Sequence, residues 1–371
     1  MANLYNYIKK YGKYSFEEVP FNEVDSIVFS SFSYVDLKKY MPKKRFERII
    51  LGEVGQKYFN NYSKRKHKNI IAAHLHGIKT FRAIRNTKRY KDIEIYNYVY
   101  KKSKAKQFCA MTLSLKEDLT YVLFEGTDHL LSGWEEDFRM SYSFPVPAQK
   151  DAIRYLNRTI KLKDKNVIIG GHSKGGNLAL VSAMYSHVFI KKKIRTIYNL
   201  DGPGVRDKQY DTSKYRSIKD KLISIIPNYS FVGTLLRCPE YRVVKAPRVT
   251  LFSHDLATWE VEDDHIKETK LSSFSKKFDE YMDNFVKVNG DKKLKQYVKS
   301  IFDILKKERI KSLEQINAAK FKSIIALIKR SNDLDDDTKK MATDFMKFLV
   351  KNYSDTAKEK VKGMIPKRIK N

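Results

Sequence analysis

The sequence predicts an α/β protein with a mostly parallel central sheet, helices on both faces of that sheet and a helical C-terminal extension. From residue 107 to residue 252, short runs rich in Val, Ile, Thr and Phe alternate with segments of helical spacing, as in β-α-β units. Several of these runs are apolar throughout, as expected of strands buried on both faces. After about residue 270 the pattern is helical alone. We therefore expect an α/β domain over 1–270 and a basic helical region over 271–371, packed on that domain or covering it.

The apolar residues between 27 and 34 suit a short buried helix, and residues 61–107 are strongly basic. The remaining elements follow in chain order. The expected strands are FCAMTLSL (108–115), TYVLFEGT (120–127), NVIIG (166–170), IRTIYNL (194–200), KLISIIP (221–227) and RVTLF (248–252). The expected helices are PAQKDAIRYLNRTIKL (147–162), GNLALVSAMYSHVF (176–189), and four C-terminal segments over 272–288, 291–307, 312–330 and 335–353.

The composition indicates a folded protein of a reducing compartment. The chain has 371 residues, of which 42% are hydrophobic, so it can bury a sizeable core. Cys109 and Cys238 are the only cysteines, which excludes a disulfide framework and a metal-finger pattern. We find neither an apolar run long enough to cross a membrane nor a signal-peptide pattern, so we expect a cytoplasmic protein.

The formal net charge of +31 favours anionic partners. Bulk composition also explains it, because Lys, Tyr, Ile and Asn are all abundant, as in proteins from AT-rich genomes. The charge is spread along the chain, and no helix-turn-helix or zinc-finger pattern is present. We therefore do not expect nucleic acid as a partner, whereas peripheral attachment to an anionic membrane surface stays open.

Four of the 15 glycines stand within seven residues around Ser173. The pentapeptide GHSKG, residues 171–175, fits G-x-S-x-G and stands between an expected strand and an expected helix, the place of a nucleophile elbow. Side chains at Gly171 and Gly175 would collide with such a turn. The helix that follows would direct its N-terminal N–H groups at the serine. A glycine-rich turn of an ordinary β-α unit is the alternative; the Walker phosphate-loop pattern is absent.

A serine nucleophile needs a base and an acid that orients the base. In elbow hydrolases the chain order is serine, acid, histidine. Three histidines follow Ser173: His187 within the next helix, His254 after the expected strand RVTLF, and His265 in an acidic stretch. We predict His254 as the base, with His265 as the second candidate.

The strand IRTIYNL leads directly to Asp201, and the Gly-Pro-Gly turn after it leaves the carboxylate at the C-terminal edge of the sheet. Ligands bind at that edge in open α/β sheets. We therefore predict Asp201 as the acid. If Asp201 only braces the turn, the acid is Asp255 or Glu240, or the site has none.

An oxyanion hole of this kind takes one N–H from the residue after the nucleophile, here Lys174. The second donor comes from a loop after an earlier strand. The strand TYVLFEGT ends at Thr127, so we predict that the backbone or hydroxyl of Thr127 supplies it. We expect neither a metal ion nor an organic cofactor.

The segments GHSKGGN and FEGTDHLLSGWEEDFRMSY together resemble the fungal-type class 3 lipases. The chain is more similar to a lipase-like family of Gram-positive bacteria, the Mbeg-like proteins, which also carry motifs like NLDGPG, IPNYSFVGTLL and SHDLATW. The resemblance covers nearly the whole chain and implies an α/β-hydrolase fold and ester hydrolysis. Two positions differ from class 3 lipases: Glu125 replaces an arginine, and the Tyr229–Ser230 region replaces the acid before the histidine. NLDGPG is instead similar to the pancreatic-type lipases, which supports Asp201.

We therefore expect an esterase- or lipase-like serine hydrolase that acts on a small-molecule or lipid ester. Ser173 would attack the acyl carbonyl, His254 would move the proton and Asp201 would orient His254. An acyltransferase would use the same residues. The alternative is a catalytically inactive protein of this fold that binds an anionic surface. The sequence carries no signal for acyl chain length, head group or oligomeric state.

Overall fold

The computed structural model divides the chain into two compact units, Met1–Asp128 with Phe144–Leu271, and His129–Ser143 with Ser272–Asn371. The residues that it describes are 2–62, 72–102, 107–127, 131–238, 240–246, 253–307, 318–330, 334–336, 338–340 and 343. The expected strand RVTLF and most of the last expected helix lie outside these residues.

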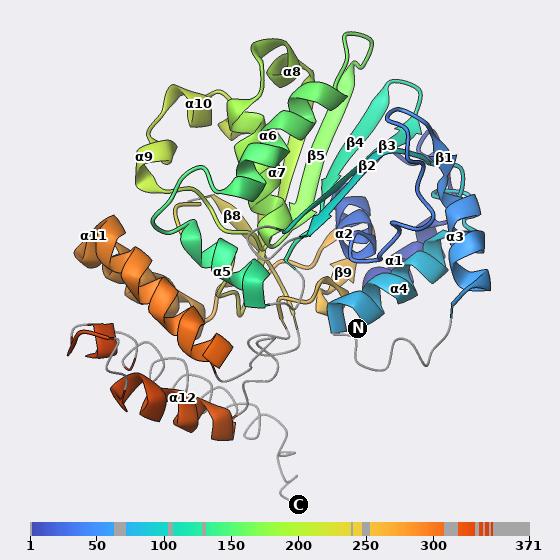
Figure 1. Cartoon of the computed structure of the whole chain (residues 1–371). Helices are drawn as coiled ribbons and strands as arrows, with labels where there is room; N and C mark the ends of the chain where they lie inside the picture. The colour runs from blue at the N-terminus through green and yellow to red at the C-terminus, as the bar shows by residue number, and fades with distance from the viewer. Residues whose placement is uncertain are drawn as a thin grey trace, which may run out of the picture. The chain divides into compact units, whose positions relative to one another are not determined.

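An eight-stranded sheet forms the centre of the first unit, and its strand order is the chain order (Figure 1). The strands are β1 (Ile49–Ile50), β2 (Glu94–Lys102), β3 (Gln107–Lys116), β4 (Leu119–Phe124), β5 (Asn166–His172), β6 (Ile194–Leu200), β7 (Leu222–Pro227) and β8 (Tyr241–Val244). Strands β1 to β4 pair antiparallel. Strands β4 to β8 pair parallel, so four of the seven pairings are parallel. The predicted α/β-hydrolase fold with a mostly parallel sheet is confirmed.

Helices and a short two-stranded ribbon precede, connect or follow these strands. They are α1 (Leu4–Tyr11), α2 (Glu23–Phe32), α3 (Leu51–Asn60), α4 (Ala72–Ile84), α6 (Pro147–Thr159), α7 (Lys174–Tyr185), α8 (Val188–Lys193), α9 (Asp207–Tyr210), α10 (Ser213–Arg216), the 3-10 helices η2 (Lys219–Lys221) and η4 (Leu256–Thr258), and the pair β9 (Val261–Glu262) and β10 (His265–Ile266). The expected helices around 27–34 and 147–162 correspond to α2 and α6. The expected helix over 176–189 is α7, which ends before α8 begins.

Local sequence explains where two of these helices begin. The side chain of Asn22 accepts hydrogen bonds from the first turn of α2, and the side chain of Asp25 accepts one from the Asn22 N–H, which completes a capping box. Helix α6 begins at Pro147, whose fixed φ suits the first helical position. The side chain of Gln149 accepts from the N–H of Val146 at 2.9 Å.

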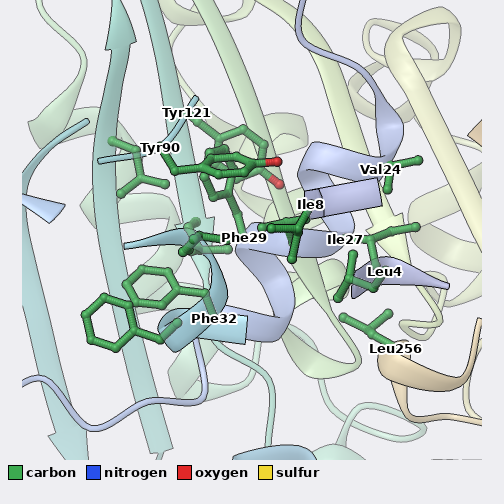
Figure 2. Packing of buried hydrophobic residues seen from close by; sticks show 14 of the residues in the cluster. Leu4, Ile8, Val24, Ile27, Phe29, Phe32, Tyr90, Tyr121 and Leu256 are labelled. Atoms are coloured by element: carbon green, nitrogen blue, oxygen red, sulfur yellow. The ribbon is translucent and has the colours of Figure 1, made fainter. Parts of the chain in front are cut away.

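Both faces of the sheet are buried, because successive residues of its central strands enter two different apolar clusters. One cluster lies under α1, α2 and α4, and Figure 2 shows its residues from α1 and α2 around Tyr90 and Tyr121. The other lies under α6 and α7. The first takes in Tyr121, Leu123, Ile168, Tyr198 and Leu200; the second takes in Val122, Phe124, Val167, Ile169 and Ile197. This alternation is the physical reason for the apolar runs.

A buried ion pair joins α2 to the segment before β2. Arg89 Nη2 lies 2.5 Å from Asp25 Oδ2, and both side chains are fully buried. The hydroxyls of Tyr7 and Tyr90 donate to Asp25 Oδ1 at 3.1 and 2.6 Å. These bonds tie α1, α2 and the chain before β2 together, because a buried charge is tolerated only where it is paired and hydrogen-bonded.

The second unit is helical, with α5 (Leu131–Arg139), α11 (Ser273–Lys307) and α12 (Ala318–Arg330). Its core includes Phe302 and Ile328, with Phe138 packed against them. Gly290 interrupts α11 with a φ of 62°, at the point where the sequence predicts the junction of two helices. Within the described ranges, no helix is both long and apolar enough to cross a bilayer.

Candidate active site

Ser173 lies in the sharp turn between β5 and α7, with φ 57° and ψ −129°. A positive φ is uncommon for a residue with a side chain and indicates a constrained backbone. The Ser173 N–H donates to the Leu200 carbonyl oxygen at 2.8 Å, and the Ser173 carbonyl accepts from the Gly176 N–H at 3.0 Å. These bonds fix the turn to β6 and to the first turn of α7. The serine therefore lies at the carboxyl edge of the sheet and at the positive end of a helix dipole.

Gly171 and Gly175 allow this turn to pack closely. A Cβ on Gly171 would lie 2.5 Å from the carbonyl oxygen of Phe124 and 2.5 Å from the carbonyl carbon of Gly175. A Cβ on Gly175 would lie 2.2 Å from the same Phe124 oxygen. All of these atoms belong to the backbone and cannot move aside, so glycine is required at both positions.

Asp201 follows β6 as Ser173 follows β5, so both lie at the same edge of the sheet. Its side chain is fully buried. Oδ1 accepts from the Ser230 hydroxyl at 2.5 Å and from the Gly233 N–H at 3.0 Å. Oδ2 lies 2.6 Å from Nδ1 of His254. The two carboxylate oxygens are thus both engaged, and one of them faces the histidine.

The imidazole of His254 can have only one tautomer in this arrangement. A carboxylate accepts hydrogen bonds, so Nδ1 of His254 carries the proton that faces Asp201. The neutral ring then has its lone pair on Nε2, the form that a general base needs. The His254 side chain is 16% exposed, whereas that of Asp201 is inaccessible, so solvent reaches part of His254 but not the carboxylate.

Several hydrogen bonds hold the loop that carries His254. The indole N–H of Trp259 donates to the Ser253 carbonyl oxygen at 2.9 Å. Asp255 accepts from the Ala257 N–H at 3.1 Å, and its other oxygen lies 2.5 Å from Nδ1 of His76 in α4. The loop is therefore held by bonds within itself and by the contact of Asp255 with His76 in α4.

His172, the last residue of β5, is buried between the turn and this loop. Its Nδ1 lies 2.7 Å from the hydroxyl of Tyr34, and its Nε2 lies 2.8 Å from the carbonyl oxygen of His254. The rings of His172 and His254 have centroids 4.3 Å apart. Burial, and then the neighbouring His254, lower the pKa of His172 well below its usual value.

The loop after β4 reaches the same turn. A Cβ on Gly126 would lie 2.5 Å from the carbonyl oxygen of His172, so this loop runs directly beside the end of β5. Thr127 is 8% exposed and Lys174 is 1% exposed. The two residues predicted for the oxyanion hole thus belong to segments that lie against the turn of Ser173.

The other candidates from the sequence lie elsewhere. His187 is exposed and precedes α8. His265 lies in the exposed part of β10, and its Nδ1 faces Asp264 at 3.2 Å. Glu240 pairs with Lys219 at 2.8 Å. None of these side chains is hydrogen-bonded to Asp201 or His254 in the described part of the chain.

In the described residues, no hydrogen bond joins the Ser173 hydroxyl to His254, and no group of three His, Cys, Asp or Glu side chains could hold a metal ion. Catalytic hydrogen bonds are often long in a free enzyme and shorten when substrate binds.

A polar cavity of about 640 Å³ lies beside α3 and is lined by Glu53, Arg85 and Lys91 among others. The elements that line it are not those that carry Ser173, Asp201 and His254.

The sequence analysis did not identify Tyr34, His172, Ser230 or Gly233 as parts of this site. Ser230 stands just after β7, and asking which polar residues follow each parallel strand would have found it. Tyr34 lies 138 residues before His172, and no local pattern connects them.

The model of the Mbeg1-like family matches residues 84–303, more than half of the 371 residues. No curated protein sequence matches the chain. Among solved structures, an M37 lipase is similar at 16% identity and a TM-score of 0.37, over 58% of this chain and 69% of that one. A Rhizomucor miehei lipase in complex with its propeptide gives 15% and 0.37, over 59% and 66%. A triacylglycerol lipase described as having a serine protease triad gives 14% and 0.36, over 64% and 84%. The family model covers more than half of the chain, and the chain therefore belongs to the Mbeg1-like family.

Proposed function

We propose that this chain is a serine hydrolase of the esterase or lipase type, with Ser173, His254 and Asp201 as its catalytic triad. The observation that carries the proposal is the 2.6 Å contact between Asp201 and the Nδ1 of His254, at the sheet edge where Ser173 lies. The strained turn at Ser173, between a strand and a helix, is what a nucleophile elbow requires.

The reaction follows from the tautomer of His254. Nε2 of His254 takes the proton of Ser173 as Oγ attacks the carbonyl carbon of an acyl ester, and gives it to the departing alcohol. Water then attacks the acyl-serine by the same route and releases the acid. Asp201 keeps the proton on Nδ1 and stabilises the imidazolium that forms in each step.

The oxyanion of each tetrahedral intermediate would be stabilised at the N-terminus of α7. The backbone N–H of Lys174 is one donor, and Thr127, in the loop beside the end of β5, supplies the other. No metal ion or organic cofactor enters this scheme.

A panel of p-nitrophenyl esters of graded acyl length tests the proposal. We expect slow hydrolysis of short and medium esters by the wild type, and a loss of at least about 10³-fold in Ser173→Ala. Ser182→Ala is the matched control, because Ser182 is a buried serine of α7, the helix that follows Ser173, and its hydroxyl donates to the Ala179 carbonyl oxygen. Equal rates in the wild type and Ser173→Ala would rule out Ser173 as the nucleophile.

The proposal extends to the location of the protein. Two buried free cysteines suit the cytoplasm, and the net charge of +31 suits attachment to an anionic lipid surface. Sedimentation with anionic vesicles at rising salt tests the attachment, since binding through many lysines weakens as salt screens the charges. Equal binding to zwitterionic vesicles, or none to anionic ones, would contradict it.

A further inference from the structure

His172 has a buried ring in which both nitrogens are engaged, although no step of the proposed reaction uses it. The residue is 3% exposed. Nε2 lies 2.8 Å from the carbonyl oxygen of His254, and Nδ1 lies 2.7 Å from the hydroxyl of Tyr34. A buried histidine of this kind either transfers protons or holds a neighbouring group by a hydrogen bond. The partners of its two nitrogens distinguish these roles.

The bonds of His172 allow one neutral tautomer. A carbonyl oxygen can only accept, so Nε2 of His172 carries the proton. Nδ1 then has the lone pair and accepts from the Tyr34 hydroxyl. Because burial lowers the pKa of His172 well below its usual value, the ring stays neutral near pH 7. His172 is therefore a fixed donor rather than an acid or a base.

The group that His172 holds is the backbone of the proposed base. His254 lies in a loop, 82 residues further along the chain, whereas His172 ends a central strand of the sheet. The hydrogen bond therefore attaches the loop to the rigid strand from which Ser173 follows directly. The two rings also lie in contact, with centroids 4.3 Å apart and a tilt of 38°.

Gly126 gives the Tyr34 hydroxyl room to reach this ring. A Cβ on Gly126 would lie 2.2 Å from the Tyr34 hydroxyl oxygen and 2.5 Å from the carbonyl oxygen of His172. Any side chain there would separate the tyrosine from the histidine. Four segments of the chain thus meet at His172: the residues after α2, the end of β4, the end of β5 and the His254 loop.

We propose that Tyr34 and His172 are positioning residues: Tyr34 fixes the tautomer of His172, and His172 fixes the place of His254 beside Ser173. The proposal rests on the proposed function, since it takes His254 as the base. A displacement of about 1 Å in a catalytic group can lower the rate by about a hundredfold, so a single hydrogen bond to the backbone of His254 has a measurable effect.

The test compares His172→Leu, His172→Gln and Tyr34→Phe by two measurements. One is kcat and KM for p-nitrophenyl butyrate. The other is the downfield proton NMR resonance of a histidine Nδ1–H held by a carboxylate, here His254, assigned by its loss in Asp201→Asn. Leucine has no donor, so we expect kcat to fall about tenfold to a hundredfold with KM within about twofold, and the resonance to broaden.

The conservative variants separate positioning from packing. Glutamine offers an amide N–H near the place of Nε2, so His172→Gln should restore the resonance and most of kcat. Tyr34→Phe loses one oxygen and should give intermediate values. Tyr155→Phe is the matched control: the Tyr155 hydroxyl is also buried, bonded to Thr112 at 2.7 Å and to the Asn97 carbonyl oxygen at 2.9 Å, and its loss should change neither measurement.

The outcomes distinguish this proposal from the proposed function. A folded His172→Leu with wild-type kcat and a sharp resonance overturns the positioning role. If that variant does not fold, a folded Tyr34→Phe with wild-type kcat and a sharp resonance overturns the positioning role instead. If the resonance broadens in these variants while the wild type hydrolyses no ester, the positioning role stands and the hydrolase proposal fails.

Discussion

Oδ2 of Asp201 lies 2.6 Å from Nδ1 of His254, and Oδ1 of the same carboxylate accepts from Ser230 and Gly233. The carboxylate therefore cannot rotate away from the imidazole without losing two other bonds. This arrangement makes the orientation of His254 depend on Asp201, and the first prediction follows from it.

Asp201→Asn should lower kcat for ester hydrolysis by about 10² to 10⁴-fold with little change in KM. The amide would favour the other tautomer of His254, which leaves no lone pair on Nε2 for the proton of Ser173. Ser230→Ala, which removes one donor to Oδ1, should give a smaller loss. A kinetic comparison in which Asp201→Asn retains wild-type kcat would mean that Asp201 only braces its turn.

Gly175→Ala should destabilise the turn and abolish hydrolysis. Its methyl group would lie 2.2 Å from the Phe124 carbonyl oxygen, so either α7 or the end of β4 must shift. Such overpacking costs about 1 to 3 kcal/mol, measurable by urea unfolding. If the alanine variant unfolds at the wild-type urea concentration and remains active, the contact is not as tight as the structure gives it.

The sequence predicted the parts of this protein that local patterns determine. The runs FCAMTLSL, TYVLFEGT, NVIIG, IRTIYNL and KLISIIP correspond to strands β3 to β7, because strands buried on both faces must be apolar. The sequence analysis missed β1, β8 and, above all, the long strand β2 (Glu94–Lys102), which pairs antiparallel with both β1 and β3. Its tyrosines stand at every second position and two lysines end it, and the sequence analysis treats this stretch only as part of a basic segment.

The residues of the candidate site also fall into those that a local sequence pattern predicts and those that only tertiary contacts bring together. Ser173 was found because an elbow requires glycines at fixed spacing, and Asp201 because it ends a strand. Their partners depend on tertiary structure: Ser230 lies 29 residues from Asp201, and Tyr34 lies 138 residues from His172. The position of Ser230 just after β7 is a signal that the sequence does carry, whereas no propensity or spacing connects Tyr34 with His172, so that contact is known only from the structure.

Asp25→Asn should lower the free energy of unfolding by about 3 to 5 kcal/mol. It would leave Arg89 buried without its counter-charge, although Arg89 would still donate to the carbonyl oxygens of Val19 and Pro20. Glu18→Gln is the control, since Glu18 pairs with Lys88 where both side chains are about half exposed, and should not change stability measurably. Equal effects of the two substitutions would contradict the account of the core.

Stability should fall as the pH drops below about 6.5, partly through His172. Because burial holds the pKa of native His172 well below its unfolded value, neither state binds a proton above pH 6.5 and only the unfolded state does below it. As the pH falls from 7.5 to 5.5 the wild type should therefore lose more stability than His172→Gln, which cannot titrate. Parallel pH profiles of urea unfolding for the two proteins would show that His172 is protonated in the native state.

Covalent labelling tests the central claim most directly, because it reports on the nucleophile whatever the natural substrate is. A fluorophosphonate probe, followed by mass spectrometry of the peptides, should modify one residue per folded chain, Ser173. The label should be absent from Ser173→Ala and slow to form in Asp201→Asn. A folded wild-type chain that takes up no label, or takes it up on another residue while Ser173 stays free, would contradict the catalytic triad.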